Sequence, residues 1–421
     1  MKIARAMIEN FRHIKRLELD FTDSIGRVRD TTLLIGPNTS GKTTILDALA
    51  VSVGLSTELS YGRPGFELSP RNIVTKGSLY TKVTCWVRFS PDEISATQEL
   101  SEIREQGDAA NDMSKRTASS PKHLPPVPHV PWPEVPDAEE VVLTWTYPDP
   151  NNRSTRGFTH CDPRSAYTLF KGRVEVARLL ATSRIGWDWF KRVGGVFTFD
   201  QQRTGMQKTI PREIWEIIHG QSTGDEPSRR ERRTSDPKTI LLNLAVQSLL
   251  PPSVKRVTED GEQRITEDGE QRITEDGKIR PGWGTEQLDQ FKLIQERYAQ
   301  VCAPHNIVGA FRDQSGVPDL VFNDGTYDYR YDGLSSGEQM LLLFLIRMVA
   351  DNIHQSIVLV DEIELHQHPV WQRKLLHLLP KMGDGNQIIA TTHSPYLRDV
   401  TPPEAVIELG EVLEPAFAPA D

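Results

Sequence analysis

The sequence predicts an α/β fold with a parallel sheet, a separate antiparallel sheet and an inserted helical part. An apolar run at 33–35 enters a glycine-bounded loop that leads into an apolar-periodic segment, the order strand, loop, helix. Apolar runs at 357–360 and 387–390 read as buried strands that alternate with helices, which is typical of a parallel sheet. Alternating patterns at 83–89 and 141–147 predict two strands of one further sheet.

Length and composition limit the class of protein. The chain of 421 residues is longer than one hydrophobic core usually organises, so we expect two lobes or one domain with insertions. No apolar run is long enough to cross a membrane, and the start of the chain lacks the apolar core of a signal peptide. Cys85, Cys161 and Cys302 form no pair motif, which indicates a reducing compartment. We therefore expect a cytoplasmic protein that does not bind membranes.

The N-terminal lobe is expected at 1–204. After the glycine loop a helix begins at Lys42 and is predicted to end at Gly54. An insertion at about 96–140 separates the two alternating strands, and its proline run fits neither a helix nor a central strand. Further strands are expected within 1–36, at 170–178 and at 196–200.

A helical insertion is expected at 205–304. The octapeptide TEDGEQRI occurs at 258–265 and again at 266–273, and a third copy starts at 274. The Asp-Gly step in each copy is a turn signal, so we predict a surface hairpin or loop; a partner-binding ribbon is the alternative. Helices are expected at 211–219, 238–250 and 285–300.

The C-terminal lobe is expected at 305–421. Strands return at 307–311 and around the turn 323–325, and they are followed by a loop at 333–339. The remaining predicted elements are helices at 340–350 and 371–379 and strands at 357–360, 387–390 and 405–409.

The loop at 36–43 has the spacing of a phosphate-binding loop. Gly36, Gly41, Lys42 and Thr43 fit the pattern G-x-x-x-x-G-K-[ST]. Such a loop directs backbone N–H groups and a helix N-terminus at one anion, while the lysine reaches the outer phosphates and the hydroxyl holds Mg²⁺. The plain alternative is a glycine-rich turn with an accidental lysine. Nucleotide contacts are expected from Asn38, Thr39, Ser40, Gly41, Lys42, Thr43 and Thr44.

Two buried strands carry polar groups just past their ends. Asp361 and Glu362 follow 357–360, and His393 follows 387–390. Asp361 can hold Mg²⁺, Glu362 can deprotonate an attacking water, and His393 can contact the γ-phosphate. Acidic residues after an ordinary strand and a satisfied loop histidine are the alternatives.

A second candidate phosphate cradle is GLSSGEQ at 333–339. Ser335, Ser336 and the Gly337 N–H would form an anion-binding helix N-terminus, with Glu338 beside them. A nucleotide bound by one chain needs only one phosphate cradle. In two facing chains, the second cradle of each chain would close over the ATP of the other. The alternative is a helix cap in which Ser335 and Glu338 form a capping box.

A weaker signal is FTFDQQR at 197–203. Gln201 or Gln202 would reach the metal or the water, and we expect Gln201 as both a catalytic and a metal-binding residue.

The order of these motifs resembles that of the ATP-binding-cassette (ABC) family. Phosphate loop, glutamine, signature, carboxylate pair and histidine follow in the family's order, and the stretches 9–19, 361–369 and 391–395 are similar to the chromosome-maintenance, RecF-like and OLD-like branch. The chain departs from that branch at Gln367, where leucine is usual. Transporter cassettes would carry LSGGQ and a proline after the glutamate, positions occupied here by Ser336 and Ile363.

The resemblance implies an ABC-ATPase head, a Mg²⁺-dependent ATP hydrolase that dimerises head-to-tail around ATP or forms a higher oligomer. It further implies that Ser336 and Gly337 act on the other subunit's nucleotide. Similar standalone ATPases belong to bacterial anti-phage systems and work with a separately encoded nuclease or toxin, and no acidic-cluster nuclease domain is expected after 395. A RecF-like DNA-binding protein that uses the arginines in 228–233, or a scaffold with a near-silent ATPase, are the alternatives.

Overall fold

The described residues form two compact units. Unit 1 comprises Met1–Ser222, Ile353–Ile363 and Gly383–Asp421, and unit 2 comprises Thr223–Asn352 and Glu364–Met382. The predicted lobe 305–421 thus contributes segments to both. The computed structural model describes residues 1–57, 70–102, 140–148, 158–173, 176, 189–200, 237–248, 255–257, 263–265, 283–312 and 318–410.

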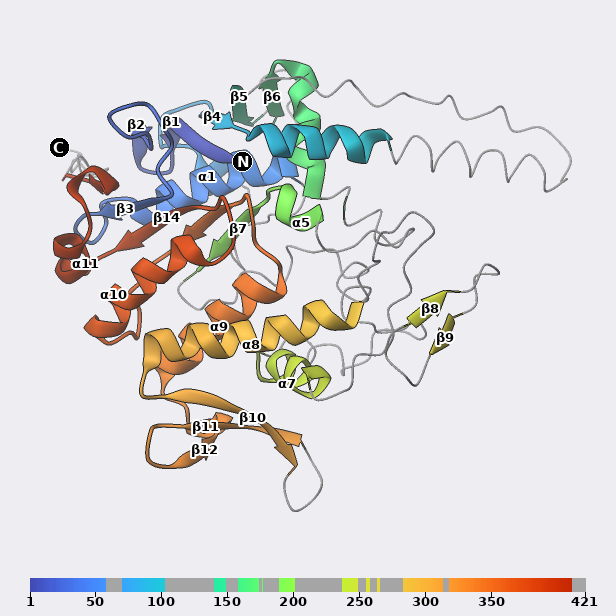
Figure 1. The fold of residues 1–421 in the computed structure, drawn as a ribbon. Helices are drawn as coiled ribbons and strands as arrows, with labels where there is room; N and C mark the ends of the chain where they lie inside the picture. Colours follow the sequence, from blue (N-terminus) through green and yellow to red (C-terminus); the bar gives the residue numbers. More distant parts are fainter. Residues whose placement is uncertain are drawn as a thin grey trace, which may run out of the picture. The chain divides into compact units, whose positions relative to one another are not determined.

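A parallel sheet organises unit 1. Its order is β15 (Val406–Glu408), β3 (Thr31–Ile35), β14 (Gln387–Thr392), β13 (Ile357–Val360) and β7 (Val196–Phe199). All neighbouring pairs run parallel, as the buried apolar runs predicted (Figure 1). The register aligns the carboxyl ends of β3, β13 and β14, so the residues after them meet at one edge.

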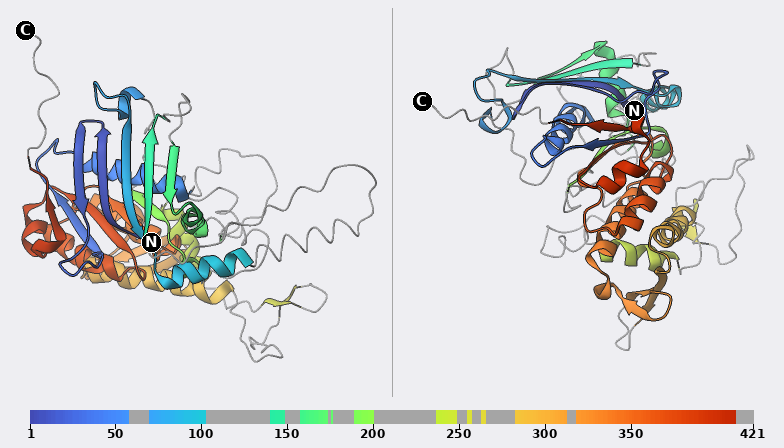
Figure 2. Two further views of the ribbon diagram at one scale, coloured as in Figure 1. Left: turned by 90° about the horizontal axis from the view of Figure 1, so that it is seen from above. Right: turned by 90° about the vertical axis from the view of Figure 1, so that its left-hand side faces the viewer.

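An antiparallel sheet forms the second layer of unit 1 (Figure 2). Its strands are β2 (Ile14–Asp20), β1 (Lys2–Phe11), β4 (Thr81–Arg88), β5 (Glu140–Tyr147) and β6 (Phe158–Asp162), in that order. In β5 every second residue is buried, which places one face on the core. The prediction that 83–89 and 141–147 are strands of one sheet is confirmed, and β4 and β5 are direct neighbours in it.

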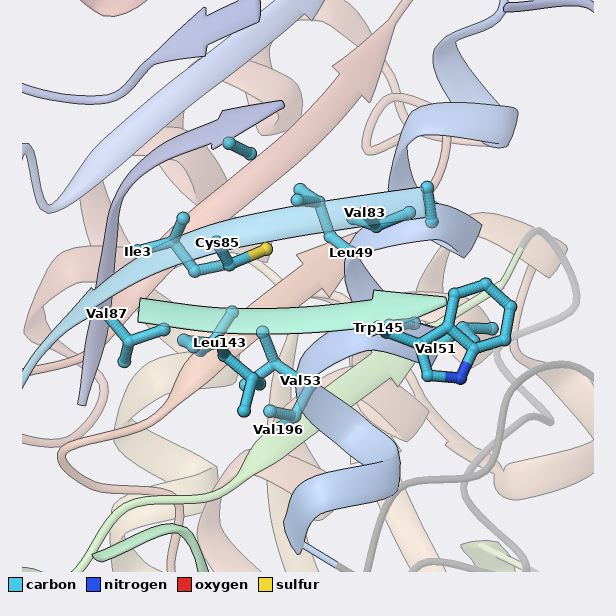
Figure 3. Packing of buried hydrophobic residues seen from close by; sticks show 14 of the residues in the cluster. Ile3, Leu49, Val51, Val53, Val83, Cys85, Val87, Leu143, Trp145 and Val196 are labelled. Carbon is cyan, nitrogen blue, oxygen red and sulfur yellow. The ribbon is translucent and has the colours of Figure 1, made fainter. Parts of the chain in front are cut away.

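The helix α1 (Lys42–Thr57) contacts strands of both sheets. Its side chains are buried on nearly all sides between Lys42 and Gly54, as expected of a helix covered from two directions. Its buried Leu49 and Val53 belong to one cluster with Cys85, Leu143 and Val196 (Figure 3). The predicted end at Gly54 is wrong: packing on two sheets outweighs the cost of about 1 kcal/mol for an interior glycine.

The predicted strand at 170–178 is also wrong. A 3-10 helix, η1 (Arg164–Lys171), occupies its start, and the described residues 172, 173 and 176 are helical. Its buried Ala166, Leu169 and Phe170 have a helical spacing that begins before the predicted strand.

Unit 2 contains four of the described helices and a small sheet. The helices are α7 (Pro237–Ser248), α8 (Trp283–Cys302), α9 (Ser336–Ala350) and α10 (Pro369–Leu378), and the antiparallel sheet comprises β10 (Asn306–Arg312), β11 (Pro318–Asn323) and β12 (Asp328–Arg330). These elements confirm the helices and strands expected within the described part of unit 2, except that α9 begins at Ser336, inside the loop expected at 333–339, because Ser335 and Glu338 cap the helix there.

The predicted hairpin at the first TEDGEQRI copy is partly described. The strands β8 (Lys255–Val257) and β9 (Gln263–Ile265) pair antiparallel on either side of its turn. The second and third copies, the helix expected at 211–219 and the arginines of 228–233 lie outside the described residues.

The described helices include none that is both long and apolar enough to cross a membrane. The cysteines are buried and free, and burial raises the pKa of the Cys85 thiol to about 12. Cysteines in this state act as small apolar residues.

The shorter helices are α2 (Pro70–Ile73), α5 (Trp189–Arg192) and α11 (Pro395–Val400), and the remaining 3-10 turns are η3 (Tyr331–Gly333), η4 (Leu379–Lys381) and η5 (Pro403–Ala405).

Candidate nucleotide-binding site

The loop between β3 and α1 depends on its glycines. Gly41 has φ +89°, a conformation that residues with a side chain rarely adopt. A Cβ atom at Gly36 would lie 2.8 Å from the Leu409 carbonyl oxygen, so the backbone approach there also requires glycine. The loop ends at Lys42, the first residue of α1, and the helix N-terminus therefore opens onto it.

The Lys42 ammonium is buried against this loop. Its Nζ donates to the carbonyl oxygens of Gly36 at 2.7 Å and Pro37 at 2.8 Å. The same atom lies 3.4 Å from Nδ1 of His393. The cation is therefore held at the mouth of the loop, where carbonyl dipoles can be exchanged for phosphate oxygens.

Thr43 and Asp361 meet as the strand ends predict. The Thr43 hydroxyl lies 3.0 and 3.1 Å from the two carboxylate oxygens of Asp361, which is 1% exposed. Asp361 also donates its backbone N–H to Phe199 O at 2.8 Å, which fixes it at the end of β7 as well as β13. A hydroxyl and a carboxylate are thus aligned at the start of α1.

Glu362 and His393 lie on the same edge. Glu362 adopts φ +48°, and its Oε1 lies 4.0 Å from Nε2 of His393. Both side chains are partly exposed, at 25% and 34%. The described residues therefore bring Lys42, Asp361, Glu362 and His393 together within unit 1.

Thr391 was missed from the sequence. Its buried hydroxyl donates to Asp361 Oδ1 at 2.7 Å and accepts the Glu362 backbone N–H at 2.8 Å. It thereby ties both carboxylate residues to β14. The one feature of the sequence that could have pointed to Thr391 is its position at the end of an apolar run. A threonine in that position is also common in ordinary strands.

Replacing Thr391 by Val should lower the free energy of unfolding. The substitution keeps the side-chain shape but leaves a buried carboxylate and a buried N–H short of a partner, a loss of about 1–3 kcal/mol. Urea unfolding measures the effect. Thr146→Val, on the partly exposed face of β5, is the matched control, and equal behaviour of both variants would contradict the assigned role.

Gln201 and Gln202 lie outside the described residues. The chain before them is described: Asp200, Thr198 and Asp361 line a small cavity at the end of β7. The buried Thr198 hydroxyl has no hydrogen-bond partner among the described residues. The role of Gln201 stays a prediction.

A hollow of about 560 Å³ is formed mainly by the segment 72–79, together with Arg12 from the turn between β1 and β2. Arg12 lines it and forms an ion pair of 2.8 Å with Asp47 of α1, and the neighbouring His13 lies against Gly41. The hollow is lined by Arg12, Asn72, Val74, Thr75, Lys76, Gly77, Ser78 and Leu79.

The signature sequence begins α9 in unit 2. Ser335 is its N-cap and forms the capping box with Glu338 that the sequence allowed. Ser335 and Ser336 are exposed, whereas Glu338 is buried. Both oxygens of Glu338 accept hydrogen bonds inside unit 2, so its expected nucleotide contact stays a prediction.

The signature turn is locked to the loop at 366–368. A Cβ atom at Gly337 would lie 2.4 Å from the His366 carbonyl oxygen, so glycine is required. Gln367, the departure from the usual leucine, donates from Nε2 to Gly337 O at 2.8 Å. The glutamine at 367, where leucine is usual, thus makes a hydrogen bond to the signature turn that a leucine could not make.

The Glu338 carboxyl has a low pKa. Burial by itself would raise the pKa, but hydrogen bonds from Ser335, Tyr298 and His305 outweigh burial and lower it from 4.5 to about 2. A carboxyl whose pKa is lower in the folded state stabilises the fold above the unfolded-state pKa, and that stabilisation is lost as the pH falls through the folded-state pKa.

Wild-type protein should therefore lose stability relative to Glu338→Gln between pH 4.5 and about 2. The contribution at neutral pH is roughly 3 kcal/mol. Urea midpoints of both proteins at a series of pH values measure the difference. Parallel pH curves for the two proteins would show that the carboxylate contributes no such stabilisation.

Two families match parts of the chain. Residues 1–76 match the family described as "AAA ATPase domain", and residues 224–399 match "AAA domain, putative AbiEii toxin, Type IV TA system". With the site geometry, these matches identify the chain as a relative of AAA/ABC-type ATPases.

Particular relatives include three bacterial proteins. "Septu protein PtuA" of Bacillus thuringiensis is 25% identical over 30% of this chain and 34% of its own length. "Retron Ec83 probable ATPase" of Escherichia coli is 23% identical over 94% of this chain and 69% of its own length. "Retron Vc95 probable ATPase" of Vibrio cholerae serotype O1 biovar El Tor is 37% identical over 14% of this chain and 11% of its own length.

Solved structures of head domains are also similar. The Smc head bound to the C-terminal winged-helix domain of ScpA matches with TM-score 0.48 and 14% identity, covering 97% of this chain and 94% of that chain. The Pyrococcus furiosus Smc head with an extended coiled coil matches with TM-score 0.47 and 16% identity, covering 96% and 92%.

Proposed function

We propose that the chain is a Mg²⁺-dependent ATP hydrolase that dimerises head-to-tail around ATP and controls a separately encoded effector in anti-phage defence. The observation that carries the hydrolase proposal is the pairing of Thr43 with Asp361 beside the buried Lys42. These three groups come from distant parts of the chain and converge at a glycine-bounded helix N-terminus. A merely structural turn has no need of that convergence.

The donor set fits Mg²⁺. A threonine hydroxyl and a carboxylate are hard oxygen ligands, and few protein ligands suffice because Mg²⁺ keeps several waters. Thr43 and Asp361 would hold the ion, with Gln201 as a further candidate, and the bound ion would neutralise charge on the phosphates.

Residues of the chain itself bind the phosphates and accept the proton of the attacking water. Lys42 and the loop amides bind phosphate oxygens, and Glu362 accepts the proton of the attacking water. His393, at 3.4 Å from the Lys42 ammonium, contacts the γ-phosphate. Ser336 and Gly337 close the site of a second copy, whose phosphate loop they face in the dimer.

The defence role rests on the relatives. Septu PtuA and the retron ATPases align with this chain, and the Retron Ec83 probable ATPase does so over 94% of this chain and 69% of its own length. We infer that the effector is a nuclease or toxin encoded beside this gene. The predicted DNA contact of the RecF-like alternative depends on arginines at 228–233, outside the described residues.

Phosphate release and phage plating test the proposal. Hydrolysis should require Mg²⁺ and be lost with a chelator, and protection against phage should require both this gene and a neighbouring reading frame. Nucleic-acid cleavage by this chain alone, with no copurifying partner, would contradict the proposal that a separately encoded protein is the effector. Turnover unaffected by the chelator would count against the metal site.

A further inference from the structure

Glu338 receives hydrogen bonds from three separate parts of unit 2. The hydroxyls of Tyr298 in α8 and Tyr329 in β12 lie 2.8 and 2.9 Å from its Oε1. His305, directly before β10, places Nδ1 2.8 Å from the same oxygen. The other oxygen, Oε2, accepts the backbone N–H and the hydroxyl of Ser335 at 2.9 and 2.7 Å. One carboxylate therefore joins three surrounding elements to the signature turn.

The proton positions follow from this arrangement. A carboxylate accepts and cannot donate, so both tyrosine hydroxyls donate to it and Nδ1 of His305 carries a proton. Charge-assisted hydrogen bonds of this kind are stronger than neutral ones. With the pKa of Glu338 at about 2, the carboxylate is ionised at every physiological pH.

The three donors are themselves held by packing. Tyr298 is fully buried and meets the ring of Phe322 edge-on, with centroids 6.0 Å apart. Tyr329 stacks on the same Phe322 at 5.9 Å, and His305 meets Trp371 of α10 edge-on at 6.2 Å. The donors are thus fixed before any ligand binds, which is the condition for positioning another group.

We propose that Tyr298, His305 and Tyr329 are positioning residues for the signature turn, acting through Glu338. The turn at 335–337 presents the exposed Ser336 hydroxyl at the start of α9, and Glu338 holds Ser335, whose backbone N–H and hydroxyl both donate to its carboxylate. The inference rests on the proposed function, in which this turn completes the ATP site of a second copy. The three residues act without touching the nucleotide.

Loss of one hydrogen-bond donor to Glu338 should lower kcat more than it weakens the binding of ATP. ATP binds first at the phosphate loop of unit 1, which these residues do not form. Removal of one hydrogen bond to the carboxylate should reduce kcat by about tenfold, equivalent to about 1.4 kcal/mol. The KM for ATP should change much less, because only the closed dimer uses the turn.

Paired substitutions at one position separate hydrogen bonding from packing. His305→Leu removes the donor, whereas His305→Asn keeps an N–H near the place of Nδ1. His305→Leu should lower kcat and His305→Asn should restore most of it. Tyr298→Phe and Tyr329→Phe should each resemble His305→Leu, since only a hydroxyl is lost. Equal kcat for the Leu and Asn variants would overturn the proposal.

Mixed dimers distinguish positioning in the partner's site from a folding defect. Lys42→Ala keeps an intact signature turn, and His305→Leu keeps an intact phosphate loop. An equal mixture contains hybrid dimers in which one of the two sites pairs the two intact parts. Turnover should return to about a quarter of the wild-type value if subunits assort at random and sites act independently.

A parallel mixture of Ser336→Arg with Lys42→Ala identifies which proposal fails. Recovery in both mixtures supports the positioning network. Recovery with Ser336→Arg but not with His305→Leu overturns the network and leaves the shared-site dimer intact. Recovery in neither mixture overturns the shared-site dimer and, with it, the network.

Discussion

Glu362→Gln should slow ATP hydrolysis by about a hundredfold or more and leave ATP bound, because general-base catalysis contributes on the order of 10²–10⁴. The amide keeps the size and shape of the carboxylate but does not accept the proton of water. Because hydrolysis opens the proposed dimer, the variant should accumulate as an ATP-bound dimer. Light scattering with ATP and Mg²⁺ measures the mass, and phosphate release measures the rate.

Glu404→Gln is the matched control. Glu404 is exposed in η5, and its backbone rather than its side chain accepts the hydrogen bond from Arg29. This variant should behave like wild type in both measurements. A monomeric Glu362→Gln protein that nevertheless binds ATP would contradict the shared-site dimer, while normal turnover would contradict the base assignment.

Lys42→Ala should abolish ATP binding at micromolar nucleotide. The ammonium is the buried cation held at the phosphate loop, and its removal leaves the Gly36 and Pro37 carbonyls without their donor. Affinity should fall by at least about a hundredfold, equivalent to about 2.8 kcal/mol. Titration of a fluorescent ATP analogue measures this loss.

A lysine on the antiparallel sheet provides the comparison. Lys82 of β4 is partly exposed and lies 3.8 Å from Glu9. Lys82→Ala removes the same charge and should leave the affinity unchanged, so a general charge effect is excluded. Equal weakening by both substitutions would place nucleotide binding elsewhere on the protein.

The nearness of Thr43, Asp361 and His393 could be predicted because it follows from the parallel sheet. Once 33–35, 357–360 and 387–390 are assigned as neighbouring strands, the residues after them share one edge. The α/β fold class is confirmed for the same reason. The roles of these residues in catalysis stay predictions, and so does that of Gln201.

The remaining parts depend on tertiary packing that local sequence does not encode. Gly54 looks like a helix end, but α1 continues because two sheets cover it. Thr391 becomes important only when Asp361 lies beside it. Tyr298 and His305 precede Glu338 by 40 and 33 residues, and nothing in the local pattern around either residue points to the carboxylate.

The lock between Gly337 and the loop at 366–368 limits how this protein can be re-engineered. A chimaera that imports a relative's signature turn, but keeps Gln367 and the His366 backbone, would combine a turn and a loop whose contacts at residue 337 no longer match. The turn at 335–337 and the loop at 366–368 are separated in the sequence but contact each other in the fold. Domain swaps among such ATPases should therefore place their boundaries outside both segments and transfer them together.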